Sequence, residues 1–193
     1  ARGFEKIAHF LSSSSEDSLL LIKGYAGTGK TTLIGHLVQQ LGIIRKKSVL
    51  MAPTGRAAKV LSAYAGKTAL TIHKKIYFPK NDKAGTGVQF TLKENKNTHT
   101  VFIVDESSMI GDERQQSKLF GNGSLLHDLV HYVNNGEKCQ LIFVGDTAQL
   151  PPVNLGLSPA LDEEELASQF NAIVYSVTLD DVVRQKAESG ILF

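Results

Sequence analysis

The segment from Gly24 to Thr31 has the residue types and the spacing of a phosphate-binding loop. It reads Gly-Tyr-Ala-Gly-Thr-Gly-Lys-Thr, which fits the pattern G-x-x-x-x-G-K-S/T. Glycines let successive backbone N–H groups turn inward around a phosphate without Cβ clashes. Lys30 would add a positive charge for the β- and γ-phosphates, and the Thr31 hydroxyl would bind Mg²⁺. We therefore predict a site for ATP and Mg²⁺ formed by Gly24, Ala26, Gly27, Thr28, Gly29, Lys30, Thr31 and Thr32.

The residues on either side of this loop agree with that prediction. Residues 19–22 are an apolar run typical of a buried strand, and apolar residues recur at helical spacing after the loop until Gly42. A bound phosphate would then also face a helix N-terminus. The alternative is a glycine-rich turn that matches the pattern by chance, but the succession of strand, loop and helix favours the phosphate site.

A pair of carboxylates, Asp105 and Glu106, directly follows the apolar run at residues 101–104. This is the Walker B arrangement, in which the aspartate helps to hold the Mg²⁺ that bridges the β- and γ-phosphates. Glu106 would be the general base for a water molecule that attacks the γ-phosphate. Taken alone, the pair would be read as an ordinary acidic strand end. Two adjacent carboxylates also require a cation, because like charges otherwise raise the pKa of one of them.

Two further polar side chains are candidates for the reaction. Gln149 lies in the loop that follows the apolar run at residues 141–144, where it could hydrogen-bond the γ-phosphate and so distinguish ATP from ADP. Pro151 and Pro152 would stiffen the exit from this loop, which suits a segment that transmits a nucleotide-dependent shift. Arg184 could neutralise charge on the transferred phosphoryl group, although a single arginine is more simply a surface residue.

Five short apolar runs predict the strands that position these side chains: residues 19–22, 49–52, 101–104, 141–144 and 172–175. Helical patterns lie between them and at residues 4–11, and the acidic run at residues 162–165 is typical of a first helical turn. Short apolar strands that alternate with helices indicate an α/β fold, with a parallel sheet covered by helices on both faces. The polar residues follow the carboxyl ends of these strands, where open α/β sheets bind ligands.

Residues 78–100 interrupt this alternation and predict a small inserted β-hairpin. Turn residues come first, and an alternation then places Val88, Phe90 and Leu92 on one face. Residues 74–96 contain six lysines against two acidic residues. This excess of positive charge fits a nucleic-acid surface, and it fits equally well a solvated hairpin whose lysines discourage edge-to-edge pairing.

The composition limits the class of protein. A chain of 193 residues with 42% hydrophobic residues is sufficient for one globular domain. The net charge of +2, from 21 basic and 19 acidic residues, is too even to indicate nucleic-acid binding by itself. A single cysteine, Cys139, excludes an internal disulfide framework and fits the cytoplasm. No apolar run approaches the roughly 18 residues that span a bilayer, so we expect no membrane partner.

Six segments of the chain, taken together, resemble helicase motifs I, Ia, Thr-x-His, II, III and IV of superfamily 1B, the RecD/Dda-like group of 5′-to-3′ DNA helicases. They occur in this order between about residue 20 and residue 185: 24–31, 52–58, 71–73, 105–109, 145–152 and 183–185. The resemblance implies a P-loop NTPase of RecA-like fold. It also implies ATP hydrolysis coupled to movement on single-stranded DNA and duplex unwinding, in DNA repair or recombination.

By the same resemblance, each matched residue has an expected role. Lys30, Thr31, Asp105 and Glu106 would carry the nucleotide and metal chemistry, Gln149 would sense the γ-phosphate, and Arg184 would be an arginine finger. The single-stranded DNA contacts would come from two segments, Pro53, Thr54, Gly55 and Arg56 in one and Thr71 and His73 in the other. The hairpin at residues 78–100 would match the small wedge, the 1B-like subdomain, that this group inserts before motif II.

Only nine residues follow Arg184, which leaves no room for the second RecA-like domain of this group. We therefore expect residues 1–193 to be the first motor domain of a longer helicase, weakly active or inactive alone. A P-loop ATPase that acts as a switch or loader is the main alternative, and a small-molecule kinase is a third. The segments at residues 53–56 and 71–73 argue for the motor, because a bare switch has no reason to carry them.

Overall fold

A six-stranded parallel sheet forms the centre of the computed structural model, which describes residues 2–13, 17–81, 88–111, 121, 123–149 and 157–179. The strand order is β3-β2-β6-β7-β1-β8, and every neighbouring pair is parallel. The strands are β1 (Ser18–Lys23), β2 (Lys47–Ala52), β3 (Ala69–Thr71), β6 (Thr100–Val104), β7 (Gln140–Gly145) and β8 (Ile173–Thr178). The predicted α/β, RecA-like P-loop fold is confirmed.

All five predicted strands are present, and the edge strand β3 is one that the sequence did not reveal. It has three residues, Ala69 to Thr71, which pair in parallel with residues 50–52 of β2. Three residues are too few to show a run or an alternation, so only the pairing with β2 defines this strand.

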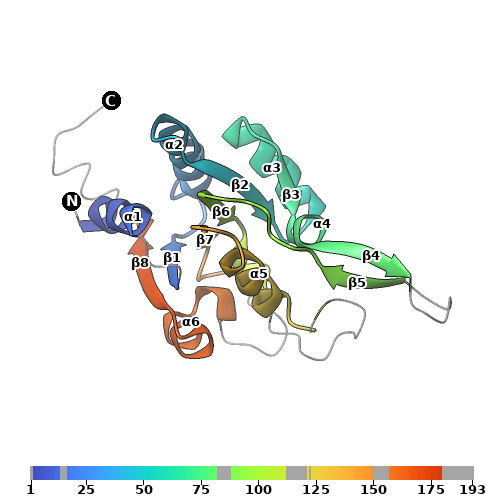
Figure 1. Cartoon of the computed structure of the whole chain (residues 1–193). Helices are drawn as coiled ribbons and strands as arrows, with labels where there is room; N and C mark the ends of the chain where they lie inside the picture. The colour runs from blue at the N-terminus through green and yellow to red at the C-terminus, as the bar shows by residue number, and fades with distance from the viewer. Residues whose placement is uncertain are drawn as a thin grey trace.

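Helices cover both faces of the sheet (Figure 1). One face carries the helices α1 (Arg2–Ser12), α2 (Lys30–Ile43) and α3 (Gly55–Ala65). The other face carries the helices α4 (Ile72–Ile76), α5 (Leu125–Asn134) and α6 (Glu163–Phe170). The 3₁₀ turns η1 (Ser107–Met109) and η2 (Pro159–Leu161) also lie on this second face. Alternate strand residues serve the two faces: Leu20 and Ile22 pack under α2, whereas Leu19 and Leu21 pack under α5. This two-sided burial explains why the strands read as continuous apolar runs.

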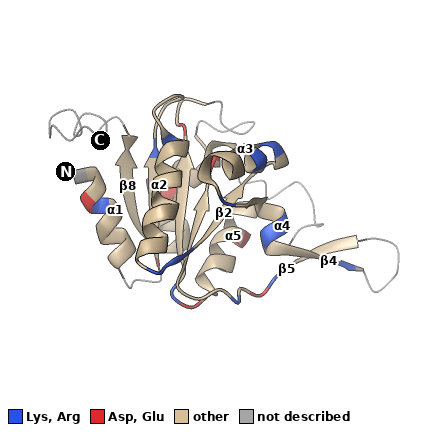
Figure 2. Cartoon of the chain, turned by 90° about the horizontal axis from the view of Figure 1, so that it is seen from above, with Lys and Arg blue, Asp and Glu red and all other residues tan. Residues whose placement is uncertain are grey.

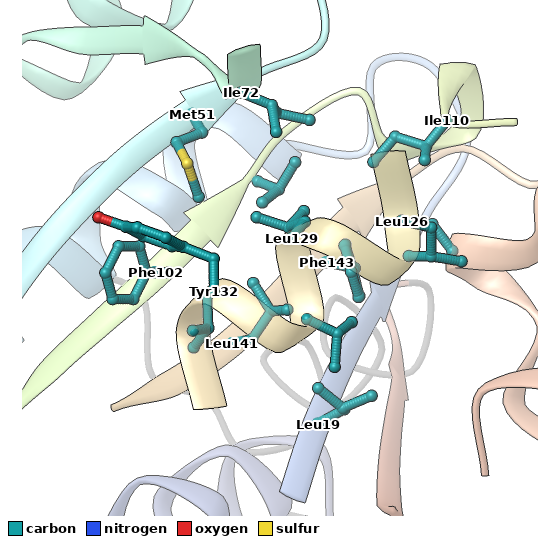
Figure 3. Packing of buried hydrophobic residues seen from close by; sticks show 14 of the residues in the cluster. Leu19, Met51, Ile72, Phe102, Ile110, Leu126, Leu129, Tyr132, Leu141 and Phe143 are labelled. Atoms are coloured by element: carbon teal, nitrogen blue, oxygen red, sulfur yellow. The ribbon is translucent and has the colours of Figure 1, made fainter. Parts of the chain in front are cut away.

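The core beneath α5 holds the strands that carry the candidate site. Leu126 and Leu129 of α5 lie over Phe143 of β7, and Tyr132 packs edge-on against Phe102 of β6 with ring centroids 5.9 Å apart (Figure 3). These side chains are almost completely buried. Close packing against α5 therefore holds β6 and β7, whose carboxyl ends carry the candidate site, in fixed positions.

The inserted hairpin is formed by β4 (Tyr77–Asn81) and β5 (Val88–Leu92) and extends beyond the sheet (Figure 1). The predicted hairpin is confirmed, but it is shorter than residues 78–100, because β5 ends at Leu92 and Thr100 already belongs to β6. At its base, the buried Tyr77 hydroxyl donates a hydrogen bond of 2.6 Å to Asp128 of α5. Burial and the neighbouring carboxylate raise the pKa of Tyr77, so the phenol keeps the proton that it donates.

The predicted helix start at the acidic run is also confirmed. The acidic run begins α6, where the Asp162 side chain accepts hydrogen bonds from the N–H groups of Glu164 and Glu165 as the N-cap. Cys139 is buried beside β7, and its thiol lies 3.3 Å from the Asn97 carbonyl. Within the described part of the chain, no helix has the length and apolarity needed to cross a membrane.

Candidate nucleotide-binding site

Three adjacent strands, β1, β7 and β6, bring the predicted phosphate loop and the acidic residues to one edge of the sheet. Lys23 at the end of β1 pairs with Gly145 of β7, and Val104 at the end of β6 pairs with Phe143 of β7. The Gly24 N–H donates to the Gly145 carbonyl at 3.1 Å. The structure therefore places the loop at residues 24–30, the acidic pair and the segment after β7 next to one another.

The three glycines of the loop are needed for two different reasons. Gly27 and Gly29 have φ angles of +78° and +85°, a left-handed backbone that strains side-chain-bearing residues. Gly24 has no such angle, but a Cβ added there would lie 2.5 Å from the Thr28 hydroxyl oxygen. That hydroxyl donates to the Tyr25 carbonyl at 2.7 Å and closes the turn. The loop shape therefore depends on each glycine.

The loop leads directly into the N-terminus of α2. The helix begins at Lys30. Its N-cap residue is Gly29, which has no side chain that could cap the first turn. The first N–H groups of a helix point along its axis without helical partners and carry partial positive charge. This end of α2 is therefore suited to a phosphate group, as the sequence predicted.

The Lys30 ammonium group is held over the loop. It donates to the carbonyls of Gly24 and Tyr25 at 2.7 and 2.8 Å, and it lies 3.9 Å from the carboxylate of Asp146. Asp146 is buried and also accepts the Ala148 N–H at 2.8 Å. Sequence reasoning missed this ion pair. The sequence signal that could have indicated this ion pair is the position of Asp146, which directly follows a predicted buried strand and so lies at the same edge of the sheet as the loop.

Asp105 is a buried carboxylate, with 8% of its surface exposed. Burial raises its pKa to about 6; a hydrogen bond from the Glu106 N–H opposes this shift, the Glu106 carboxylate adds to it, and the Lys30 charge opposes it. A buried carboxylate that resists ionisation gains from a nearby cation. Oxygen ligands such as this carboxylate and the Thr31 hydroxyl are those that Mg²⁺ prefers, so the residues fit a nucleotide-bound Mg²⁺.

The chain turns sharply between Asp105 and the η1 turn. Glu106 has a φ of +54°, which is uncommon for a residue with a side chain. It is half-buried, and the next two residues, Ser107 and Ser108, are buried in η1. Such local strain persists when surrounding contacts fix the backbone, and it is frequent at functional sites.

Gln149 lies above this turn and contacts it directly. Its side-chain oxygen accepts a hydrogen bond of 2.6 Å from the Ser108 hydroxyl. The structure thus links the segment after β7 to the acidic segment after β6. Sequence reasoning selected Gln149 but not Ser108, because no local pattern indicates which residue meets its side chain. Arg184, Pro151 and Pro152 lie outside the described residues.

The two segments predicted to contact nucleic acid lie side by side, at the far side of β6 from the phosphate loop. Ala52 pairs with Thr71, so residues 53–56 and 71–73 leave neighbouring strands. Thr54 caps α3 by accepting the Ala57 N–H at 3.2 Å, and Thr71 caps α4 in the same way. Both hydroxyls keep a proton that can be donated outward.

Beside these segments, α4 and the hairpin line an open hollow of about 450 Å³ with a largely apolar lining. The lining residues are His73, Lys74, Tyr77, Phe78, Pro79, Phe90 and Lys93. Basic residues lie along α4 and the hairpin (Figure 2). The His73 ring lies 5.7 Å from that of Tyr77, and burial lowers the pKa of His73. Sequence reasoning found the lysines of this region but not the hollow.

The chain is similar to known proteins along almost its whole length. Residues 5–191 match the family model described as an AAA domain. The chain is 32% identical over 192 residues to the ATP-dependent RecD2 DNA helicase of Deinococcus radiodurans, and the match covers 97% of this chain and 22% of that protein. It is 34% identical over 152 residues to the ATP-dependent DNA helicase dda of phage T4, covering 72% of this chain and 29% of that protein.

Among solved structures, the chain is similar to a Pif1 helicase from Bacteroides, with a TM-score of 0.48 and 20% identity over 92% of this chain and 42% of that one. The chain spans less than a third of the length of these two curated relatives. The family match covers almost the whole chain. The chain belongs to the AAA domain family and, by its ordered motifs, to the superfamily 1B, RecD/Dda-like group of P-loop proteins.

Proposed function

We propose that this chain is the ATP-binding and ATP-hydrolysing motor domain of a DNA helicase that moves on single-stranded DNA, 5′ to 3′, and unwinds duplexes. One observation carries the proposal: Lys30, the acidic pair at residues 105–106 and Gln149 converge at one edge of the sheet, beside a helix N-terminus. The RecD2 and Dda relatives, which are named as ATP-dependent DNA helicases, support it.

Each residue at this edge has a role that its position supports. Lys30 and the first N–H groups of α2 would bind the phosphates of ATP, displacing the Gly24 and Tyr25 carbonyls from the ammonium group. Thr31 and Asp105 would hold Mg²⁺, which supplies charge neutralisation on the β- and γ-phosphates. Glu106 would accept the proton of the attacking water. Gln149 would donate its amide N–H to the γ-phosphate and so report its presence.

The single strand would lie across the neighbouring ends of β2 and β3. The first turn of α3 offers N–H groups and the exposed Arg56 to a phosphate, as Pro53 and Gly55 lead the chain into that turn. Thr71 and His73 lie alongside, and the apolar hollow beyond them has rings against which a base could stack. The lysines at its rim, Lys74 and Lys93, suit a phosphodiester backbone.

Unwinding would further require a second motor domain and Arg184 as a charge donor, because both serve to close the site around ATP. The hairpin would act as the wedge. We place the protein in the cytoplasm, a reducing compartment that suits a chain with a single cysteine, Cys139. A nucleotide-dependent switch remains the second candidate. The motor is favoured because residues 53–56, residues 71–73 and the hollow lie next to one another. A nucleotide-dependent switch does not need such a continuous surface for a nucleic-acid strand.

The test measures the affinity of the chain for a fluorescent oligo(dT) strand by anisotropy, with a duplex of equal length as the comparison. We expect preferential binding of the single strand and weaker binding after Arg56→Ala or Lys93→Ala. Lys59→Ala, an exposed lysine on α3, is the matched control. If the single strand does not bind, or if all three variants behave like the parent chain, the motor hypothesis is wrong and the switch hypothesis gains.

A further inference from the structure

We propose that Ser108 is a positioning residue for Gln149: its hydroxyl fixes the side-chain amide so that the N–H donors face the γ-phosphate of bound ATP. The inference rests on the proposed function, in which Gln149 senses that phosphate. Its basis is the 2.6 Å hydrogen bond from the Ser108 hydroxyl to the Gln149 side-chain oxygen. Ser108 is 2% exposed, whereas Gln149 is an exposed residue.

The turn that carries Ser108 is fixed independently of Gln149. The Ser107 hydroxyl donates to the Val104 carbonyl at 2.9 Å, which ties the turn to the end of β6. From the other direction, the buried Ser158 hydroxyl lies 2.9 Å from the Ser107 carbonyl and 2.6 Å from the Ile110 carbonyl. A Cβ at Gly145 would lie 3.1 Å from the Ser108 N, so β7 itself approaches this turn closely. Ser108 is therefore a stationary donor.

The direction of the hydrogen bond decides what Gln149 presents to a ligand. A glutamine amide has one oxygen acceptor and an NH₂ group with two donors. A phosphate offers only acceptors, so an amide that turned its oxygen toward the γ-phosphate would place two acceptors together. With its oxygen occupied by the Ser108 hydroxyl, the amide presents its donors instead. Removal of the hydroxyl would leave Gln149 in place but let both orientations compete.

The experiment measures, by calorimetry with Mg²⁺, the affinities of the chain for the non-hydrolysable analogue AMP-PNP and for ADP. We expect Ser108→Ala to weaken AMP-PNP binding by about 3- to 10-fold, the range for one hydrogen bond. We expect ADP binding to stay unchanged, because ADP lacks the phosphate that Gln149 senses. Ser108→Thr, which keeps the hydroxyl, should restore the ratio of the two affinities.

Two further variants separate positioning from general loosening of the turn. Ser107→Ala removes a buried hydroxyl from the same turn without touching Gln149, so it should lower stability and leave the affinity ratio unchanged. In a Gln149→Ala background, Ser108→Ala should cause no further loss, because the residue that it orients is gone. Unfolding curves for every variant establish that each one is folded.

The outcomes distinguish this proposal from the one on which it rests. If Ser107→Ala and Ser108→Ala change the ratio equally, or if the effect of Ser108→Ala persists without Gln149, positioning is refuted and the role of Gln149 stands. If Gln149→Ala itself leaves the ratio unchanged, Gln149 does not sense the γ-phosphate, and both proposals are overturned.

Discussion

Replacement of Asp105 by asparagine should stabilise the ligand-free protein while weakening its binding of Mg-ATP. The folded structure raises the pKa of this carboxyl from 3.8 to about 6, chiefly through burial. At about 1.4 kcal/mol per pKa unit, ionised Asp105 costs the fold up to about 3 kcal/mol at neutral pH. Asparagine carries no charge, and its side-chain oxygen can still accept the Glu106 N–H that Asp105 accepts at 2.9 Å.

The raised pKa of Asp105 also determines how the stability gain of Asp105→Asn depends on pH. Because the folded state holds this proton more tightly than the unfolded state, the contribution of Asp105 to stability falls as the pH rises from about 4 to about 6. The advantage of Asp105→Asn should therefore be largest at about pH 7.5 and about half as large at pH 5.

Urea unfolding of the parent chain and Asp105→Asn at these two pH values, without nucleotide or divalent cation, measures the difference. Asp17→Asn replaces an exposed aspartate and is the control; it should leave the free energy of unfolding unchanged at both pH values. If Asp105→Asn is no more stable than the parent chain at about pH 7.5, or if its gain does not shrink with acid, burial is not what perturbs this carboxyl.

Four other changes test separate parts of the proposal. Lys30→Ala should abolish Mg-ATP binding in calorimetry, and retained binding would remove the phosphate role of Lys30. Glu106→Gln should keep that binding but slow hydrolysis by at least about 100-fold in a phosphate-release assay; unchanged turnover would exclude it as the base. Thr54→Ala should lower the free energy of unfolding by about 1 kcal/mol in urea, because α3 loses its N-cap, and an unchanged value would contradict that contact. Neutralising Lys80 and Lys93 together should flatten the salt dependence of oligo(dT) binding by about 1.4 units of slope, whereas an unchanged slope would mean that these lysines are only solvated.

Local patterns were sufficient to predict the sheet and the phosphate loop. The inner strands β1, β6 and β7 are buried on both faces, so each appears as a continuous apolar run. The loop glycines follow a fixed spacing because the backbone angles of Gly27 and Gly29 and the close contact at Gly24 require them. By contrast, β3 and α4 have three and five residues and depend on contacts for their existence. Thr71, the N-cap of α4, is itself the last residue of β3, a strand too short to recognise from its own sequence.

The residues that sequence reasoning missed at the site all act across strands. Asp146 matters because β7 lies next to β1, which places its carboxylate 3.9 Å from Lys30. Ser108 and Ser158 matter because segments some 40 to 50 positions apart meet above the same turn. Serine and aspartate are common in loops of every kind, so residue type alone does not reveal such partners.

The charges at the site explain why nucleotide and metal should bind together. Among the described residues, Lys30 lies near two carboxylates, Asp105 and Asp146, and the Glu106 carboxylate adds negative charge beside Asp105. A polyphosphate brings further negative charge, which the Lys30 ammonium group and the N-terminus of α2 cannot balance. Under the proposed function, a divalent cation that arrived with the phosphates would supply that balance and would also favour the ionised form of Asp105, which burial disfavours. Each ligand would then remove the electrostatic cost that the other meets alone, so we expect their binding to be coupled through Asp105.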